Sequence, residues 1–99
     1  MAEYVLTKKA VEDLTKIWGY TYEVWSETQA DKYYLLLLDY CQEIAENPLL
    51  GKNYAEVNND LFGFRASHHI IFYQKQITNQ IKIIRILHSR MDLKSRIQE

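Results

Sequence analysis

The sequence predicts a single domain of the α+β class, in which a helical hairpin covers one face of a small antiparallel sheet. Two long stretches in the first half place apolar residues at helical spacing, and three stretches in the second half are rich in β-branched and aromatic residues. The chain has 99 residues, of which 47% are hydrophobic and 25% are charged. This composition is typical of a globular protein, and residues 1–99 suffice for one core and little more.

The first helix is expected to follow a short strand. Residues 3–7 alternate and contain β-formers, which indicates the strand. From Lys8 the period changes, and apolar side chains three and four positions apart predict one buried helix face. The members of this stripe are Ala10, Leu14, Ile17, Trp18, Thr21 and Trp25. Asp13 and the other charged residues fall off the stripe, so they are expected on the solvated face.

A second helix is expected from the capping-box spacing of Ser26 and Gln29 to about Asn47. Pro48 ends it, because proline disfavours helical backbone in the residue before it. Its apolar face contains Ala30, Tyr34, Leu37, Leu38, Cys41, Ile44 and Ala45. The two helices, joined by a short loop, form a hairpin in which each apolar stripe needs a partner surface.

The second half of the chain predicts three strands. They are expected at residues 62–67, 70–73 and 81–88, after an irregular polar stretch at 48–62. Residues 89–99 are polar and basic, and they are expected to form a flexible tail.

Several classes of site and location are excluded by composition. The single cysteine, Cys41, allows neither an internal disulfide nor a paired-cysteine metal site, and its place on an apolar helix face predicts a buried, unreactive thiol. No metal-binding or phosphate-cradling motif is present, so we expect no cofactor and no metal. The start of the chain lacks the features of a signal peptide, and the longest aliphatic run, residues 35–38, is too short to span a bilayer. We therefore expect a cytoplasmic protein.

Charge is divided unevenly along the chain. Residues 1–59 contain five Lys/Arg against ten Asp/Glu, whereas residues 60–99 contain seven against three. Such a dipolar distribution can steer encounters with charged partners. The alternative is that the two halves merely present different solvated surfaces.

Five segments resemble, in order, the corresponding segments of ParE-type toxins in the RelE/ParE superfamily. They are residues 17–25, 29–33, 45–51, 69–73 and 84–92. No single segment is specific, but together they span almost the whole chain in the β-α-α-β-β-β order of that superfamily. The resemblance implies a toxin of a type II toxin–antitoxin system, encoded with a ParD-like or other small antitoxin that silences it in a complex. It also implies DNA gyrase as the target, which such a toxin poisons so that cleaved DNA persists.

The other branch of the superfamily, which resembles RelE, cleaves mRNA on the ribosome, and this chain departs from its pattern. Metal-independent RNA cleavage needs groups that move protons and cations that stabilise the phosphorane-like transition state. The RelE-like arginine of the central strand corresponds here to Ile70, and the expected lysines fall on Leu61 and Gly63. The expected tyrosine falls near Arg96, and only Arg90 matches. The resemblance therefore implies a toxin that binds and is not an enzyme.

Three alternatives stay open from the sequence. The first is a RelE-like ribosome-dependent endonuclease, the second is a toxin with another target, and the third is a degenerate toxin that serves only as an antitoxin-binding module. We expect no direct sequence-specific binding to nucleic acid, because the aromatic residues at helical spacing are expected to pack in the core or to face a protein partner, and no strongly basic groove is indicated.

The histidines are the remaining candidates for chemistry. His68 and His69 are adjacent and would point to opposite faces of a strand, so they are not expected to act as a pair. His88 ends the last strand beside Arg90, where it could serve acid–base chemistry at neutral pH. We favour the simpler interpretation, in which His88 anchors the tail through a hydrogen bond to the sheet edge.

Two binding surfaces are predicted. An antitoxin segment, disordered when free, is expected to fold as a helix, with or without an added strand, into a groove at the edge of the hairpin. The apolar anchors would be Trp18, Tyr22, Trp25, Leu61 and Phe64, and Arg65, Arg85 and Arg90 would pair with antitoxin carboxylates. For each of these residues the alternative is a core or solvated position. The target surface is assigned to the last strand and tail, namely His88, Ser89, Arg90, Met91, Asp92 and Lys94.

Overall fold

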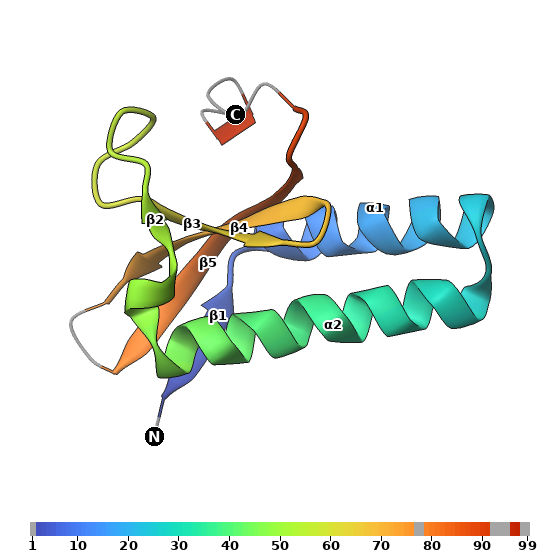
Figure 1. Cartoon of the computed structure of the whole chain (residues 1–99), viewed down its shortest axis with the longest axis horizontal. Coiled ribbons are helices and arrows are strands. Elements are labelled where there is room, and N and C mark those ends of the chain that lie inside the picture. The colour runs from blue at the N-terminus through green and yellow to red at the C-terminus, as the bar shows by residue number, and fades with distance from the viewer. Residues whose placement is uncertain (1, 77–78, 92–95, 98–99) are drawn as a thin grey trace.

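The computed structural model describes residues 2–76, 79–91 and 96–97. The elements follow in the order β1 (Glu3–Leu6), α1 (Lys8–Val24), α2 (Glu27–Glu46), the short 3-10 helix η1 (Pro48–Leu50), β2 (Lys52–Asn53), β3 (Phe62–Ala66), β4 (His69–Lys75) and β5 (Gln80–His88). The two helices lie side by side as a hairpin against one sheet, and their connected end extends beyond it (Figure 1). The predicted α+β class and helical hairpin are confirmed.

The start of each helix is fixed by a hydroxyl group. Thr7 Oγ1 accepts a hydrogen bond from the backbone N–H of Ala10 at 3.1 Å and donates to the carbonyl of Ile84 at 2.8 Å. It therefore caps α1 and ties the cap to β5. Ser26 Oγ accepts from the N–H of Gln29 at 3.1 Å, which is the serine half of the predicted capping box.

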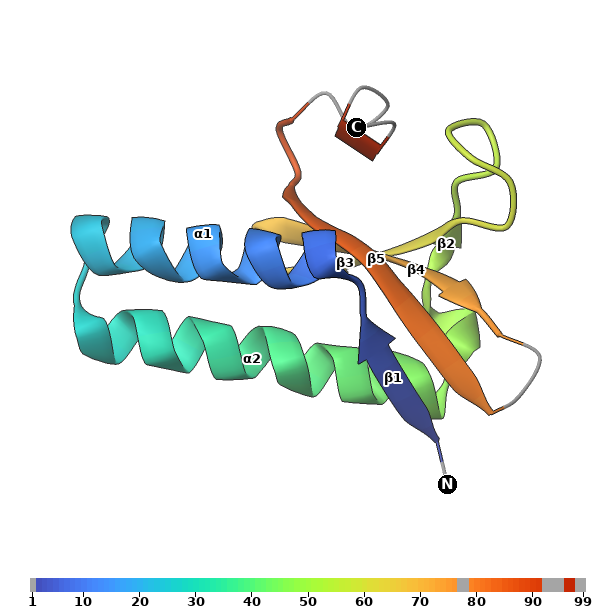
Figure 2. The ribbon, with the colours of Figure 1, turned by 180° about the vertical axis from the view of Figure 1, so that it is seen from behind.

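The sheet of the described residues has the strand order β1-β5-β4-β3-β2. The sheet is antiparallel as predicted except at β1, which pairs with β5 in parallel, from Glu3 opposite Gln80 to Leu6 opposite Ile83. Figure 2 shows these two strands side by side. The alternation of apolar and polar residues within a strand does not indicate the direction of its partner strand. That direction depends here on the path of the chain through the helical hairpin and the strands between β1 and β5. The two-residue β2 was also missed, because its polar residues give no strand signal.

Two apolar clusters lie on opposite faces of the sheet. The larger cluster packs between the hairpin and the sheet, and Leu14, Leu37, Ile71 and Tyr73 are among its buried members. Cys41 is fully buried there, and burial raises the pKa of its thiol to about 12, as expected for an unreactive cysteine.

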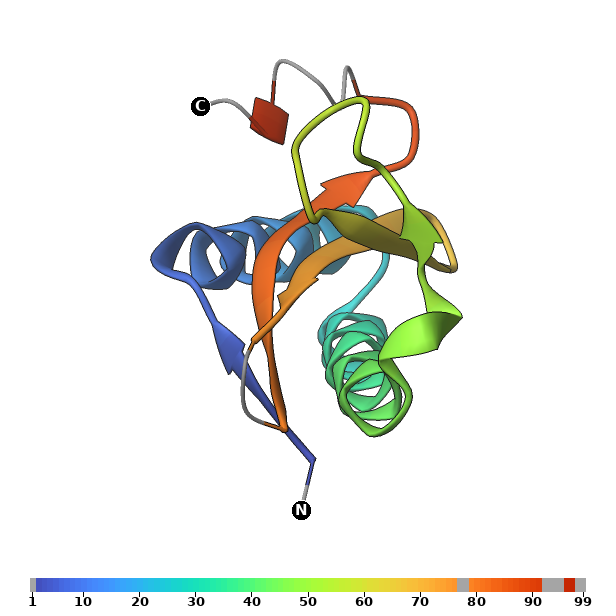
Figure 3. The ribbon, with the colours of Figure 1, turned by 90° about the vertical axis from the view of Figure 1, so that its left-hand side faces the viewer.

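The smaller cluster covers the other face and contains Leu61, Ile70, Phe72 and Leu87, with Tyr54, Val57, Ile84 and Ile97 packed against it. The β2–β3 loop and the described end of the chain lie on this same side of the sheet (Figure 3). The sheet face opposite the hairpin is therefore covered by the protein's own β2–β3 loop and by Ile97 near the end of the chain.

Tyr73 fixes the segment that follows α2. Its hydroxyl donates to the carbonyl of Pro48 at 2.7 Å and accepts from the N–H of Gly51 at 2.8 Å. A side chain at Gly51 would meet the Tyr73 ring and hydroxyl, so this close approach requires glycine. Within the described ranges, neither of the two long helices contains the extended apolar stretch that crossing a bilayer requires.

Candidate functional site

An open cavity of about 890 Å³ is lined by the helical hairpin, the β3–β4 turn and the end of β5 with the residues that follow it. Four parts of the chain contribute: the second half of α1, the start of α2, the β3–β4 turn, and β5 with the residues after it. The lining residues are Lys16, Ile17, Tyr20, Thr21, Trp25, Gln29, Tyr33, Arg65, Ser67, His68, His69, His88, Ser89, Arg90 and Met91. The volume lies within the roughly 300–1,000 Å³ of ordinary ligand pockets.

Helical periodicity explains the contribution of α1. Ile17 and Thr21 are four residues apart, so both face the cavity from neighbouring turns, and Tyr20 flanks them. Trp25 follows the last helical residue and is 73% exposed. An exposed tryptophan at the rim of a cavity is typical of a binding surface, because burying it later releases much apolar area from water.

The β3–β4 turn brings the histidines together. Ser67 adopts a positive φ of 59°, and this tight turn connects Ala66 at the end of β3 to His69 at the start of β4. His68 therefore lies in the turn, where strand alternation does not apply. The ring of His68 stacks parallel to that of His88 with centroids 6.5 Å apart, and the ring of His69 meets His88 edge-on at 5.3 Å.

His69 is neutral at physiological pH. Burial, and then the neighbouring His88 and His68, lower its pKa from 6.5 to about 4. Its Nδ1 lies 2.6 Å from the hydroxyl of Tyr33. Burial raises the pKa of Tyr33, so this hydrogen bond joins two uncharged side chains.

His88 holds the segment after β5. Its Nδ1 accepts a hydrogen bond from the backbone N–H of Arg90 at 3.1 Å, and its carbonyl accepts from the N–H of Met91 at 3.0 Å. The N–H of Ser89 donates to the carbonyl of His68 at 3.0 Å. The expected anchoring role of His88 is therefore present, although the ring bonds to the tail backbone and not to the sheet edge. Sequence spacing gave no sign that all three histidines meet.

The cavity is positively charged. Lys16, Arg65 and Arg90 line it from three different elements, and none of the lining residues within the described part of the chain is an aspartate or glutamate. Arg65 is exposed, and its Nε donates to the carbonyl of Ser67 at 3.0 Å, which holds the guanidinium beside the turn. The positive charge of the cavity contrasts with the formal net charge of the whole chain, which is −1.

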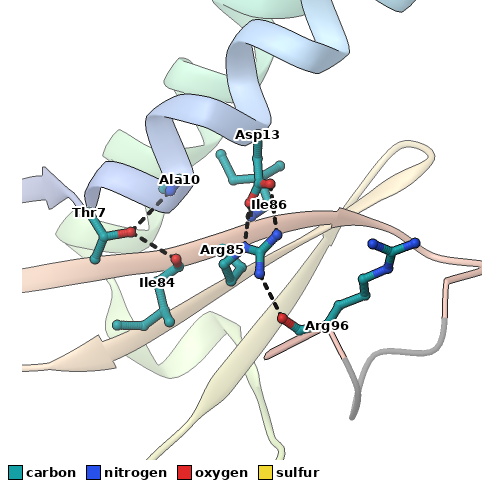
Figure 4. Close-up of polar contacts among 7 residues, drawn as sticks. All are labelled: Thr7, Ala10, Asp13, Ile84, Arg85, Ile86 and Arg96. Atoms are coloured by element: carbon teal, nitrogen blue, oxygen red, sulfur yellow. Dashed lines mark hydrogen bonds and ion pairs between the residues drawn. The ribbon is translucent and has the colours of Figure 1, made fainter. Parts of the chain in front are cut away.

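Arg85, predicted to pair with antitoxin carboxylates, is instead buried in an ion pair with Asp13 (Figure 4). Its Nε and Nη2 donate to the two carboxylate oxygens at 2.8 and 2.9 Å, and Asp13 Oδ2 also accepts from the N–H of Ile86 at 3.0 Å. The prediction that Asp13 lies on the solvated helix face was wrong, because this pair draws it onto the sheet. Arg85 Nη1 donates to the carbonyl of Arg96 at 2.6 Å.

The other predicted antitoxin-binding residues divide into three groups. Leu61 is fully buried in the smaller cluster, and Phe64 packs against the larger cluster beside Tyr40, so neither side chain stands free as an anchor. Trp18 and Tyr22 stack on each other at 5.3 Å, outside the cavity lining. The indole N–H of Trp18 donates to Asp31 at 3.0 Å. Trp25 and Arg65 line the cavity.

The predicted target-binding residues His88, Ser89, Arg90 and Met91 all line the cavity, whereas residues 92 and 94, named above as Asp92 and Lys94, lie outside the described residues. The described parts of the predicted flexible tail are anchored. Residues 89–91 are held by backbone hydrogen bonds, and Ile97 packs on the smaller cluster.

Positions that would carry cations in a RelE-like nuclease are part of the core. Ile70 is 7% exposed, and Leu61 is fully buried. A side chain at Gly63 would meet the ring of Tyr54 and the side chain of Ile70. Within the described part of the chain, no group of three or more His, Cys, Asp or Glu residues is arranged to hold a metal ion.

The chain is similar to named proteins over nearly its whole length. A family model described as the ParE toxin of type II toxin-antitoxin system, parDE, matches residues 4–93. Toxin ParE1 of Mycobacterium tuberculosis is 32% identical over 92 residues, covering 93% of this chain and 94% of that protein. Toxin ParE of Escherichia coli is 30% identical over 99 residues, covering 100% of this chain and 96% of that protein. A solved structure described as the chromosomal ParDE TA system from P. aeruginosa matches with a TM-score of 0.75 at 16% identity, covering 89% of this chain and 95% of that one, and it supports the fold.

Proposed function

The chain belongs to the ParE toxin family, and from this premise we propose that it is the toxin of a type II toxin–antitoxin system, neutralised by a ParD-like antitoxin. It acts in the cytoplasm by binding DNA gyrase, without catalysing a reaction. The observation that carries the proposal is the cavity, because one surface gathers residues expected to bind the antitoxin and residues expected to bind the target.

The antitoxin is proposed to bury the exposed aromatic and apolar side chains at the cavity. Tyr20 is 69% exposed, Trp25 73% and Met91 42%. Apolar area removed from water contributes about 25 cal/mol per Å², so a partner segment that covers these side chains gains substantially from burial. The similar structure from P. aeruginosa is described as a ParDE TA system, which supports an antitoxin as the partner.

Neutralisation is proposed to work by occlusion. Trp25 and Arg65, from the predicted antitoxin surface, line the same cavity as Arg90 and Met91, from the predicted target surface. An antitoxin segment that fills the cavity therefore covers both sets of residues, so the target can no longer contact Arg90 and Met91. Mutually exclusive occupancy needs no conformational change in the toxin.

A RelE-like ribosome-dependent endonuclease is the second candidate, and one observation favours it. The cavity contains the hydrogen-bonded side chains of Tyr33 and His69, which are residue types used in general acid–base catalysis, and the cations Arg65 and Arg90 also line it. Against it, the RelE-like cation positions are filled by buried apolar residues, as at Ile70. A degenerate toxin that only binds its antitoxin is the third candidate.

Expression of the chain alone, without its antitoxin, separates these candidates. A gyrase-directed toxin produces filamentous cells and a DNA-damage response. A ribosome-dependent endonuclease produces translation arrest with cleaved message, and this outcome would contradict the proposal. Unimpaired growth would identify an inert binding module.

The antitoxin surface is tested by Trp25→Ala, with Leu49→Ala as the matched control. Both side chains are exposed, Leu49 by 78%, but Leu49 lies in η1 and not in the cavity lining. Trp25→Ala is expected to weaken binding to the product of the neighbouring open reading frame at least about tenfold, because a buried aromatic anchor contributes 2 kcal/mol or more. The melting temperature is expected to change little. Equal losses of binding and stability would contradict the assignment of Trp25 to the antitoxin surface.

A further inference from the structure

We propose that a face of the helical hairpin outside the cavity binds a second copy of this chain, with the two α1 helices packed antiparallel. This outer face consists of Val11, Thr15, Trp18, Gly19, Tyr22 and Leu35, and none of these residues lines the cavity. The inference goes beyond the proposed function, because it concerns a different surface and a different partner.

The outer face is a stripe along α1 that continues onto α2. Val11, Trp18 and Tyr22 follow one another at intervals of seven and four residues, so they project from the same side of α1. The rings of Trp18 and Tyr22 stack with centroids 5.3 Å apart, and the indole N–H of Trp18 donates to Asp31 on α2 at 3.0 Å. Leu35 lies one helical turn after Asp31 and therefore borders the same face.

The first argument is the exposure of apolar side chains on this face. Val11 is 48% exposed, Tyr22 47% and Leu35 59%. The indole N–H of Trp18 is already bonded to Asp31, so the ring offers only apolar surface to a partner. Apolar side chains that gather on one exposed face mark a site of protein contact.

The second argument is a glycine inside the helix. Gly19 lies in α1 one turn after Thr15, and glycine in a helix interior is less favourable than alanine. Its φ is not positive, and apart from its own stretch of helix no described atom lies within 4 Å of the position that a Cβ would take. Neither its backbone conformation nor a described neighbour therefore requires glycine. A helix that approaches from another molecule does, because the missing side chain lets two backbones come close together.

The third argument is that the charges of α1 oppose its own dipole. The first turn contains Lys8 and no acidic residue, and the last turn contains Glu23 and no basic residue. A helix is positive at its N-terminus and negative at its C-terminus, so both charges are unfavourable within one chain. Both residues border the outer face, because Lys8 precedes Thr15 by seven residues and Glu23 follows Gly19 by four. In an antiparallel pair Lys8 of each copy lies beside Glu23 of the other, which relieves both conflicts.

These features favour a second copy of this chain as the partner. A two-fold contact needs a surface that is complementary to itself. The outer face meets this requirement, because it has an apolar centre with Lys8 near one end and Glu23 near the other. The α1 helix of a second copy has the apolar stripe and the order of charges that an antiparallel partner needs. The contact uses no residue of the cavity lining.

Sedimentation equilibrium of the purified full chain tests the inference, and we expect an equilibrium between monomer and dimer. Leu35→Glu is expected to weaken self-association at least about tenfold, because the contact would bury a charge among apolar side chains. Leu36→Glu is the matched control, since Leu36 is 40% exposed but projects from a different side of α2. It is expected to associate as the unmodified chain does. Neither variant is expected to lower the melting temperature.

An exchange of charges tests the antiparallel orientation. Lys8→Glu and Glu23→Lys are each expected to weaken self-association several-fold, because each places like charges together across the contact. Each change also removes an unfavourable interaction with the helix dipole, so the loss would not arise from reduced stability. The double variant is expected to restore association, since the two exchanged residues again meet as opposite charges. Lys82→Glu on β5 changes the net charge as Lys8→Glu does, lies outside the outer face, and is the control.

Three results would overturn the inference. The first is a chain that stays monomeric at every concentration, the second is equal association of Leu35→Glu and Leu36→Glu, and the third is a double charge variant that associates no better than the single ones. Unchanged self-association of Leu35→Glu with a loss of antitoxin binding would also overturn it, because the outer face would then belong to the antitoxin.

The measurement of self-association is independent of toxicity. If the chain is monomeric but arrests growth and binds its antitoxin, only the inference is wrong. If it dimerises through the outer face while neither growth arrest nor antitoxin binding is seen, only the proposed function is wrong.

Discussion

Asp13→Asn is expected to destabilise the protein strongly, although the change removes only one charge and keeps the shape of the side chain. Both Asp13 oxygens accept hydrogen bonds, from Arg85 Nε and Nη2 and from the N–H of Ile86. Whichever oxygen becomes an amide nitrogen, it places a donor against a donor. The side chains of Arg85 and Asp13 are 10% and 8% exposed, so water cannot readily replace the lost partner.

The expected loss is large relative to the total stability. Removing one partner of a buried ion pair costs about 3–5 kcal/mol, out of the roughly 5–15 kcal/mol that stabilises a typical domain. For a chain of this length each kcal/mol lowers the melting temperature by about 4–8 °C, so a decrease of at least about 12 °C is expected. The assay is urea denaturation followed by circular dichroism, with the free energy of unfolding extrapolated to water.

Two companion variants make the result specific. Glu12→Gln removes the same charge from the neighbouring exposed position and is expected to change stability by less than about 0.5 kcal/mol. The double variant Asp13→Leu with Arg85→Met is expected to lose less than Asp13→Asn, because apolar replacement leaves no buried charge unpaired. A loss below about 1 kcal/mol in Asp13→Asn, which is the level of a surface ion pair, would refute this reasoning.

Three further predictions follow from single contacts. The pKa of His69 is about 4 in the folded protein against 6.5 for a free histidine, so its neutral form stabilises the fold fully above about pH 6.5, and this contribution is lost as the pH falls toward 4. His69→Gln is expected to flatten the pH dependence of the free energy of unfolding in this range. The same slope in the variant and in the unmodified protein would contradict this prediction. Gly51→Ala drives a methyl group into Tyr73 and is expected to cost about 1–3 kcal/mol in urea denaturation, whereas unchanged stability would mean that the ring moves freely. Leu61→Ala is expected to lower the free energy of unfolding by about 2–5 kcal/mol because the side chain is fully buried, and Leu49→Ala, at an exposed position, is the control. A loss of antitoxin binding without a loss of stability would instead support the predicted role of Leu61 as an antitoxin anchor.

Local signals in the sequence predicted the helices well. Ser26 and Pro48 mark the two limits of α2, and the period of apolar residues after Lys8 identifies α1, because capping and helical spacing act over a few residues. The same signals could not predict that β1 pairs with β5 in parallel, since the partner strands lie more than 70 residues apart in the sequence.

The site was predicted less completely, because several of its features depend on long-range contacts. Asp13 has the spacing of a solvated residue, and only the approach of Arg85, 72 residues away, draws it into the core. His68 and His88 meet because the turn at Ser67 places one ring beside the other. Trp25, by contrast, was predicted from its residue type and its place at the end of the first apolar stripe. It does line the cavity, and its role in binding stays a prediction.

The central claim, that the chain harms cells by binding and not by catalysis, is tested most directly by incubating the purified protein with DNA gyrase, ATP and plasmid DNA. A parallel reaction contains translating ribosomes and labelled message. We predict that linear, gyrase-linked DNA accumulates in the first reaction in proportion to the toxin added, while the message in the second stays intact. Intact plasmid together with message cut on the ribosome would contradict the account.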